Sequence, residues 1–160
     1  MSIEAVRAYF AEKGREEDIR EFEVSSATVE LAAAALDVEP ARIAKTLSFH
    51  SVEDDGCILV VAAGDVKVDS GKFKRQFGLK AKMLNPEEVL LWTGHAVGGV
   101  SPFANPAGAK TYLDISLQRF TTVFPACGSS NSAIELTCDE LFQYADGIEW
   151  IDVCKGWQSE

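Results

Sequence analysis

Hydrophobic residues recur along this chain with two spacings, and these spacings predict where helices and strands lie. After Ser2, a residue type that caps helices, Ile3, Val6 and Phe10 recur at helical spacing until Gly14, which predicts an N-terminal helix. The other predicted helices are marked by a polar cap at the start, by a proline at the first helical position, or by a glycine at the end. The later predicted helices are Thr28 to Leu36, preceded by Ser25 or Ser26, a short one from Pro40, Asp69 or Ser70 to before Gly78, Asn85-Pro86-Glu87-Glu88 to Gly94, and Thr137-Cys138-Asp139-Glu140 to Tyr144.

Short apolar runs between these helices predict strands. Thr46 to Phe49 and Cys57 to Ala62 flank the polar segment Glu53-Asp54-Asp55-Gly56, a pattern typical of a β-hairpin. Several strands are joined by turns too short for helical crossovers, which indicates an α+β domain with a mixed sheet flanked by helices and not a doubly wound fold. The longest irregular loop is predicted at positions 95–108, and the other strands at Phe22 and Val24, Lys110 to Asp114, Phe120 to Ala126, Ala133 to Leu136, and Ile148 to Val153.

Length and charge narrow this picture. The chain has 160 residues, the size of one ordinary domain, so we expect residues 1–160 to form a single domain. Its net charge of −10 argues against a dedicated duplex-DNA-binding protein, which would carry a basic surplus. The longest apolar run, Cys57 to Ala63, is far shorter than the roughly 20 residues that span a bilayer. The polar start of the chain also lacks the apolar segment of a signal peptide.

The cysteines bear on compartment and on metal binding. They form no CxxC pair, and the two histidines, His50 and His95, lie far from any cysteine pair. We therefore expect reduced and mostly buried thiols, a cytoplasmic location, no zinc site and no other cofactor. The four cysteines are Cys57, Cys127, Cys138 and Cys154.

Several common reaction types have no motif here. The sequence contains no HExxH, no G-x-S-x-G, and no GxGxxG after a strand, so metalloprotease, serine hydrolase and dinucleotide-binding sites of those types are not predicted. The triplet Gly71-Lys72-Phe73 resembles a phosphate-binding loop, but it lacks the upstream glycine and the Ser or Thr after the lysine.

Three local features remain as candidates for chemistry, and each also has a purely structural interpretation. Lys45 lies between apolar residues at the start of a strand, so its side chain either snorkels to solvent or is positioned in a cleft. The run Gly98-Gly99-Val100-Ser101-Pro102-Phe103 either brings backbone N–H groups close to a ligand or forms a tight loop. The run Gly128-Ser129-Ser130-Asn131 either binds a polar ligand or forms a polar hairpin turn.

One segment of this acidic chain is basic. Positions 67–82 contain six cations against the single acid Asp69, a concentration suited to phosphate contacts, although a solvated helix face has the same composition. The cations are Lys67, Lys72, Lys74, Arg75, Lys80 and Lys82.

Taken together, these features resemble the YbaK/EbsC family, also called the prolyl-tRNA synthetase-associated or editing-domain family. The resemblance runs from about Ser25 to Leu141. It is carried by short motifs in the order and spacing of the family. They include the family's lysine, which is Lys45, and its GxxxP loop, which is Gly98 to Pro102. The motifs are Ser26 to Ala33, Arg42-Ile43-Ala44-Lys45-Thr46-Leu47, Val61-Ala62-Ala63-Gly64-Asp65, Thr93 to Phe103, Tyr112-Leu113-Asp114, and Cys127-Gly128-Ser129-Ser130-Asn131.

The resemblance implies a mixed, curved, largely antiparallel sheet flanked by helices, and hydrolysis of the ester that joins a wrong amino acid to tRNA. Family members remove alanine, cysteine or other small residues, either as an insertion in prolyl-tRNA synthetase or as freestanding proteins. Because this chain has no synthetase modules, the resemblance implies a freestanding trans-editing factor. Its expected partner is the acceptor end of aminoacyl-tRNA, with an aminoacyl-tRNA synthetase as a further candidate, and neither a membrane nor duplex DNA is expected.

The resemblance also implies roles for particular residues. Lys45 is expected to anchor the terminal phosphate or the ester carbonyl as a fixed cation. Backbone N–H groups of Gly98, Gly99, Val100 and Ser101 are expected to stabilise the oxyanion, while a ribose hydroxyl of the substrate assists the attacking water. Substrate binding is expected of Thr46, Pro102, Phe103, Asp114, Gly128, Ser129, Ser130 and Asn131, and tRNA contact of Lys67, Lys72, Lys74 and Arg75.

The amino acid that is removed stays open at this stage. A pocket closed by Val100 and Phe103 is expected to admit only a small side chain, and one methylene is worth only about 1–3 kcal/mol there. The run Ser129-Ser130-Asn131 stands where some family members carry a glycine-rich pattern. Cys127 either lines this pocket or is a buried structural thiol. Two alternatives to editing are a non-catalytic tRNA- or synthetase-binding module and a hydrolase of another small acyl ester.

Overall fold

A six-stranded mixed sheet forms the centre of the protein in a computed structural model, which describes residues 2–51 and 56–157. In spatial order its strands are β8 (Leu136–Thr137), β6 (Thr122–Pro125), β2 (Ile43–His50), β3 (Cys57–Ala63), β5 (Ala109–Asp114) and β9 (Trp150–Ile151). Two small antiparallel sheets pair β1 (Arg20–Glu21) with β7 (Ser132–Ala133) and β4 (Lys67–Val68) with β10 (Cys154–Lys155).

The predicted hairpin is confirmed as the antiparallel pair of β2 and β3, which runs in register from Ala44 opposite Ala63 to His50 opposite Cys57. Every residue of β3 is buried, as an apolar run in a central strand requires. Positions 53–55 of the predicted turn lie outside the described residues.

The α+β class and the mixed, curled sheet are as predicted. The central sheet contains more parallel strand pairs than the expected largely antiparallel arrangement. Within the central sheet β2–β3 and β6–β8 are antiparallel, but β2–β6, β3–β5 and β5–β9 are parallel. Parallel neighbours need long connections, and the chain supplies them by passing through several short elements between β3 and β5 and between β5 and β9. The prediction from short turns therefore gave too few crossover connections between parallel strands.

The described residues form five helices around the sheet, and polar residues cap four of them. The caps Asp69, Asn85 and Thr137 are as predicted, whereas the second helix is capped by Thr28 and not by Ser25 or Ser26. Asn85 and Thr137 each form a full capping box with a glutamate three residues on, and Thr28 and Asp69 cap two other helices. None of the helices within residues 2–51 and 56–157 has the length and apolar character needed to cross a bilayer. The helices are α1 (Ser2–Ala11), α2 (Val29–Leu36), α3 (Ser70–Phe77), α4 (Pro86–Thr93) and α5 (Cys138–Tyr144), with 3-10 turns η1 (Glu16–Asp18), η2 (Pro40–Arg42) and η3 (Ile115–Arg119).

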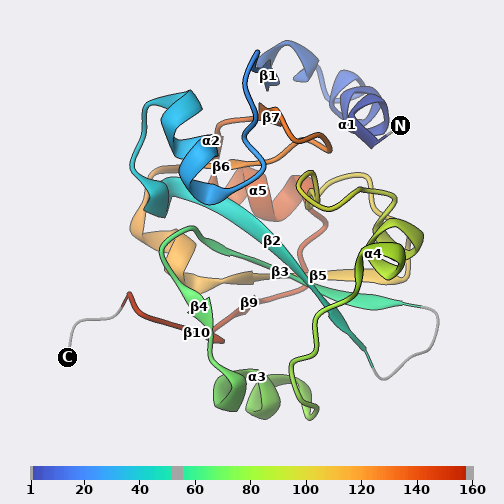
Figure 1. The fold of residues 1–160 in the computed structure, drawn as a ribbon, viewed down its shortest axis with the longest axis vertical. Coiled ribbons are helices and arrows are strands. Elements are labelled where there is room, and N and C mark those ends of the chain that lie inside the picture. Colours follow the sequence, from blue (N-terminus) through green and yellow to red (C-terminus); the bar gives the residue numbers. More distant parts are fainter. Residues whose placement is uncertain (1, 52–55, 158–160) are drawn as a thin grey trace.

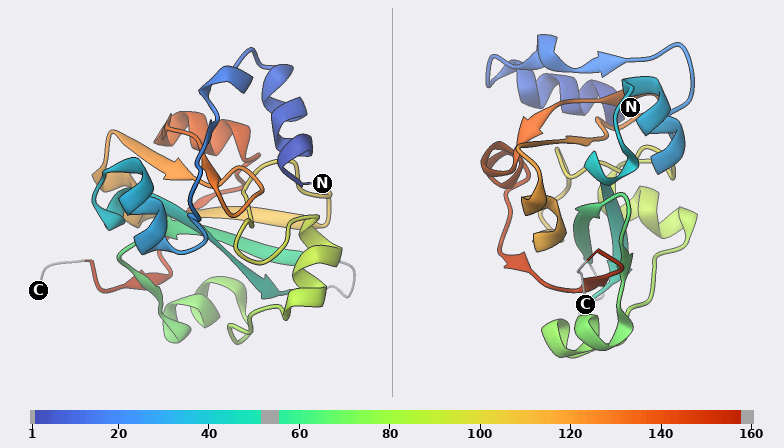
Figure 2. Two further views of the ribbon diagram at one scale, coloured as in Figure 1. Left: turned by 45° about the horizontal axis from the view of Figure 1, so that its top comes forward. Right: turned by 90° about the vertical axis from the view of Figure 1, so that its left-hand side faces the viewer.

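The two faces of β2 carry different helices (Figure 1). Phe49 packs against α3, while Ser48 lies opposite Leu59, which joins a buried cluster with α4. Side chains alternate between the faces of a strand, so Lys45 shares the face of Phe49 and Thr46 shares the face of Ser48. Figure 2 shows α1 and β1 at one end of the molecule and α3 with the C-terminal segment at the other.

Most element boundaries differ from the predicted ones by a few residues. The strand predicted at Phe22 and Val24 is instead β1, two residues earlier, and the run from Ala133 to Leu136 is divided between β7 and β8. The last predicted strand is only the two residues of β9. These short strands pair with edges contributed from distant parts of the chain, which local hydrophobic patterns do not reveal.

Candidate functional site

A pocket of about 390 Å³ opens along one edge of β2. This volume lies within the range of small-ligand sites. The pocket wraps around the strand edge, so that α2 and its preceding loop form one wall and α4 and the loop after it form the other. Most of its lining is apolar, and the residues that matter below are Lys45, Thr46, Val89, Gly98, Val100 and Phe124.

Lys45 is the cation of this pocket. Its side chain is half-buried, and its ammonium donates a hydrogen bond to the carbonyl oxygen of Val66. Burial lowers the pKa of Lys45 below its ordinary value, and the carboxylates of Asp65 and Glu30 oppose this shift in part. A half-buried ammonium is less hydrated than a surface lysine, so its interaction with an anionic or carbonyl oxygen is stronger there.

The loop after α4 places Gly98 in the opposite wall, while Gly99 is buried and does not line the pocket. Gly98 has φ of +92°, and a Cβ there would lie 3.3 Å from the Cβ of Ala27. A Cβ on Gly99 would lie 2.9 Å from backbone atoms of Ser129. Only glycine allows this approach, so the GxxxP loop and the loop at Gly128 pack directly on one another beside Lys45.

The loop from Gly128 to Asn131 holds the N-terminal wall of the pocket. The backbone N–H of Ser26 donates to the carbonyl of Ser130 at 2.6 Å, and the amide of Asn131 donates to the carbonyl of Phe22 at 2.9 Å. The hydroxyl of Ser129 is hydrogen-bonded within this region, with its oxygen 2.9 Å from Oδ1 of Asn131 and 2.7 Å from Oγ of Ser132. The polar groups of Ser129 and Asn131 are therefore engaged in holding the segment before α2, and the adjoining Ser132 lines the pocket.

Several residues expected to bind substrate lie elsewhere. Phe103 is fully buried and packs edge-on against Phe10, with ring centroids 4.8 Å apart, and Pro102 lines a separate pocket beside Tyr9. Asp114 is fully buried and accepts hydrogen bonds from the N–H groups of Ser116 and Val153, at 2.9 Å each. Phe103, Pro102 and Asp114 do not line the pocket of Lys45. Their polar or apolar character alone did not distinguish a buried structural role from a binding one.

Two residues that the sequence did not single out for this purpose fix the shape of the GxxxP loop. The ring of His95, which is 1% exposed, donates from Nε2 to the carbonyl of Phe103 at 2.9 Å, and the side-chain amide of Asn105 donates to the carbonyl of Ser101 at 2.9 Å. Burial lowers the pKa of His95, so the neutral ring is favoured. The sequence offers one signal for His95: it directly follows Gly94, the glycine that ends α4, and a residue in that position begins a loop.

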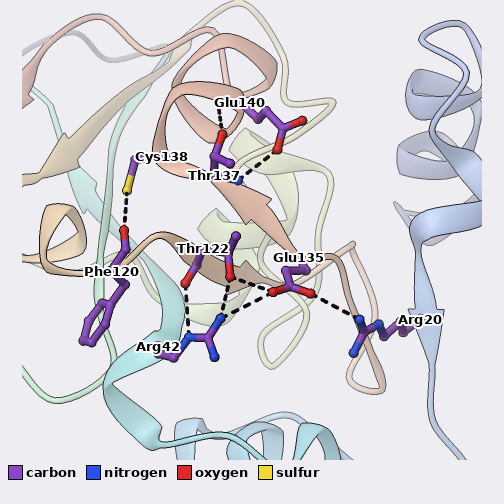
Figure 3. A network of polar contacts seen from close by, with 8 residues as sticks. All are labelled: Arg20, Arg42, Phe120, Thr122, Glu135, Thr137, Cys138 and Glu140. Carbon is purple, nitrogen blue, oxygen red and sulfur yellow. Dashed lines mark hydrogen bonds and ion pairs between the residues drawn. The ribbon is translucent and has the colours of Figure 1, made fainter.

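A polar network joins Arg42, Thr122, Glu135 and Arg20 (Figure 3). Its two arginines lie over the ring of Phe124, which forms part of the pocket wall. Arg42 donates from Nε to the carbonyl of Thr122 at 3.2 Å and from Nη2 to its hydroxyl, and Glu135 accepts from Thr122, Arg42 and Arg20. The guanidinium carbons of Arg42 and Arg20 lie 5.0 Å and 5.8 Å from the centroid of the Phe124 ring. Such cation–π contacts and ion pairs restrict where the ring lies.

Four of the six cations of the basic segment lie on β4 and α3. Lys67, Lys74 and Arg75 are exposed, whereas Lys72 donates to Asp152 and to the carbonyl of Cys154, at 3.0 Å each. Figure 1 shows α3 at the far end of the molecule from α1, below the sheet. None of these four cations lines the pocket, although Lys67 directly follows Val66, whose carbonyl accepts from the ammonium of Lys45.

The cysteines are free thiols. Cys57, Cys127 and Cys154 are buried and Cys138 is half-buried. Cys127 lies in the main hydrophobic core, where burial raises the pKa of its thiol, and it is absent from the pocket lining. Within the described part of the chain, no three His, Cys, Asp or Glu residues are arranged to hold a metal ion.

Several known proteins are similar to this chain over most of its length. The uncharacterised protein YwhH of Bacillus subtilis is 56% identical over 158 residues, which is 99% of this chain and 100% of YwhH. A proline–tRNA ligase of Bacillus pumilus is 29% identical over 75% of this chain and 22% of the ligase. The solved structure of a protein proposed to be a trans-editing enzyme for prolyl-tRNA synthetase has a TM-score of 0.85 at 29% identity, covering 97% of this chain and 98% of that one. Residues 23–144 match the aminoacyl-tRNA editing domain, and the chain belongs to that family.

Proposed function

We propose that this protein is a freestanding aminoacyl-tRNA deacylase, which hydrolyses the ester of a tRNA mischarged with a small amino acid. The observation that carries the proposal is that Lys45 and the GxxxP loop line one pocket of about 390 Å³. Membership of the editing-domain family and the similarity to a protein proposed to edit for prolyl-tRNA synthetase support the reaction class.

In this mechanism the protein positions a reactive ester and stabilises the charge that develops on it. Lys45 anchors the terminal phosphate or the ester carbonyl, and the backbone N–H groups of Gly98 and Val100, which line the pocket, donate to the oxyanion. The N–H of Gly99 already donates to the carbonyl of Ala96 at 2.9 Å, so the oxyanion role expected of Gly99 is not part of this mechanism. Since an aminoacyl ester is already activated, a ribose hydroxyl of the substrate is sufficient to orient the water. The side chain of Ser101 is buried behind the loop and takes no part.

Selection by size follows from the lining of the pocket. Val89, Val100 and Phe124 leave an apolar recess, which accommodates a small side chain beside the ribose. A larger side chain must displace buried groups, and each methylene excluded in this way is worth about 1–3 kcal/mol.

The tRNA body is expected to approach from the basic surface. Lys67, Lys74 and Arg75 are exposed on β4 and α3 and are available for phosphate contacts, while Lys72 is shared with Asp152. Such contacts make the affinity depend on salt. A synthetase is a further partner in this proposal, and the place of action is the cytoplasm, where charged tRNA is made and used.

The experiment is a deacylation assay with tRNA that carries alanine, cysteine, serine or threonine. Native protein is compared with Lys45→Ala and with Lys13→Ala, a matched loss of an exposed cation that lies over the ring of Tyr9. We expect release of at least one amino acid, a loss on the order of 10²–10³ in rate for Lys45→Ala, and little change for Lys13→Ala. Full activity of Lys45→Ala removes Lys45 from the mechanism.

A non-catalytic binding module is the second candidate, because exposed cations that do not line the pocket can bind tRNA without catalysis. Titration of tRNA binding against salt, run beside the deacylation assay, distinguishes the two. Tight, salt-sensitive binding without release of any amino acid favours the module. Faster turnover of free small esters than of charged tRNA favours a hydrolase of another substrate class.

A further inference from the structure

Along one edge of β2, inside the pocket, the backbone of a single residue has no neighbouring strand to pair with among the described residues. On one side β6 pairs with β2 only at Ile43 and Ala44. On the other side the chain at Leu84 rejoins β2, where its N–H donates to the carbonyl of Ser48 at 3.1 Å. Between these two contacts lies Thr46, and residues 43–48 all line the pocket.

The backbone groups of Thr46 point toward this opening. The hydrogen bond of Ser48 to Leu84, and that of the His50 N–H to the carbonyl of Lys82 at 2.8 Å, show that even-numbered residues of β2 direct their N–H and C=O away from β3. By the alternation of an antiparallel ladder, Thr46 does the same. Within the described residues, its N–H and C=O have no ladder partner. One donor and one acceptor thus stand side by side on the pocket wall.

A single amino acid can satisfy both groups in only one way. In an antiparallel hydrogen-bonded pair, two residues exchange both N–H···O bonds, whereas parallel pairing spreads the bonds over neighbouring residues. We propose that the open edge at Thr46 binds the α-aminoacyl group of the substrate as a one-residue antiparallel strand: the α-ammonium donates to the Thr46 carbonyl, and the ester carbonyl accepts from the Thr46 N–H. This inference rests on the proposed function and deepens it, since it names the chemical group that the pocket recognises.

The antiparallel direction fits the charges around the opening. It places the ester oxygen, and with it the ribose and phosphate, on the side of the residue that precedes Thr46, which is Lys45. The ammonium then lies on the side of Ser48, away from the cation. Like charges are thereby separated and the phosphate meets the ammonium of Lys45.

Pairing also fixes where the amino-acid side chain goes. Directly opposite residues of an antiparallel pair present their side chains on the same face, so the side chain of an L-amino acid points to the face of Thr46. This face carries Leu59, Val89 and Val100, and the last two line the pocket. The D-enantiomer sends its side chain to the face of Lys45.

The experiment uses a stable analogue, 3′-(L-alanylamino)-3′-deoxyadenosine, and follows the backbone amides of the full chain by ¹⁵N–¹H NMR. The amide proton of Thr46 is expected to move downfield in a saturable manner, since it gains a hydrogen bond. The D-alanyl and propionyl analogues, which misplace the side chain or lack the ammonium, are expected to bind roughly tenfold more weakly or worse, as the loss of a hydrogen bond to a charged group implies.

A backbone substitution isolates the donor. Replacement of the Lys45–Thr46 amide by an ester, with the α-hydroxy analogue of threonine at position 46, removes this N–H and no native ladder bond. The same replacement at Val60, which pairs with Leu47 inside the ladder, is the matched control. Weakened binding of the L-alanyl analogue is expected only for position 46.

Failure of this inference is distinguishable from failure of the proposed function. Binding with an unmoved Thr46 amide, equal binding of the D-alanyl analogue, or no saturable binding at millimolar concentration overturns the pairing, even if native protein deacylates alanyl-tRNA. A saturable Thr46 shift without deacylation of any charged tRNA supports the pairing and contradicts the enzyme.

Discussion

The two edges of the strand β2 differ in what their backbone groups do. Along the edge that faces β3, the antiparallel pairing runs without interruption from Ala44 to His50, and the partner strand is wholly buried. Along the opposite edge, pairing stops after Ala44 and resumes at Ser48, with a pocket between. The same eight residues therefore stabilise the fold on one side and leave unpaired polar groups on the other.

Two polar groups on the pocket side of β2 are partly or wholly removed from water. The hydroxyl Oγ1 of Thr46 is buried and has no hydrogen-bond partner among the residues that the structure describes, and burial lowers the pKa of Lys45. A buried polar group without a partner costs about 1–3 kcal/mol, and proteins commonly tolerate such costs at functional sites. The contrast predicts that changes on the β3 side lower stability, whereas changes on the pocket side lower activity.

The largest expected effect is on the β3 side. Leu59→Ala removes a fully buried side chain from the cluster with Leu84 and Val89, and we expect the free energy of unfolding to fall by about 2–5 kcal/mol. Denaturant titration measures this change. A loss below about 1 kcal/mol contradicts the view that this edge carries the stability.

Gly99→Ala is expected to act on the pocket side and to have the next largest effect. A Cβ at Gly99 meets the backbone of Ser129 at 2.9 Å, so the two loops must separate, which we expect to reduce deacylation at least about tenfold and to lower stability by about 1–3 kcal/mol. Gly71→Ala is the matched control, since its Cβ meets nothing nearer than 3.2 Å. Equal deacylation rates for the two variants contradict the role given to the loop contact.

Thr46→Val tests the unpartnered hydroxyl. Valine has the same shape and removes the buried Oγ1, so we expect the free energy of unfolding to rise by about 1 kcal/mol. Thermal and denaturant unfolding measure the change. A decrease in stability shows that Oγ1 has a hydrogen-bond partner in the folded protein. The polar groups on the pocket side of β2 would then be paired, as they are on the β3 side.

The smallest expected effect is the pH dependence that Lys45 contributes. Burial lowers its pKa below the ordinary value of 10.5, so between the folded pKa and 10.5 the unfolded chain holds more protons. Stability contributed by this group therefore rises with pH through that window. Unfolding of native protein and Lys45→Met, compared across alkaline pH, measures the difference. A difference that falls with increasing pH contradicts the burial of this ammonium.

Local features of the fold followed from the sequence, whereas the edges of the sheet did not. The apolar run from Cys57 predicted the buried strand, and the capping boxes at Asn85 and Thr137 were confirmed. The opening at Thr46 depends on where β6 leaves β2, at the pair of Ala44 and Pro125. That point is set by contacts between residues about 80 positions apart, which no local pattern encodes.

The candidate site was predicted in part for the same reason. Lys45 and Gly98 were identified from their local context and do line one pocket. Phe103 and Asp114 lie in motifs of the same family but are fully buried, and a motif does not distinguish a residue that touches the ligand from one that supports the loop. The β2 edge could not be found by residue type, because its donor and acceptor belong to the backbone.

Single-turnover hydrolysis of tRNA charged with alanine, cysteine, serine or threonine is the most direct test of the central claim. Native protein in excess is predicted to release at least one of these amino acids far faster than buffer alone, and the substitution Lys45→Ala is predicted to slow that release by about 10²–10³. Release from all four charged tRNAs at the rate seen in buffer would contradict the account.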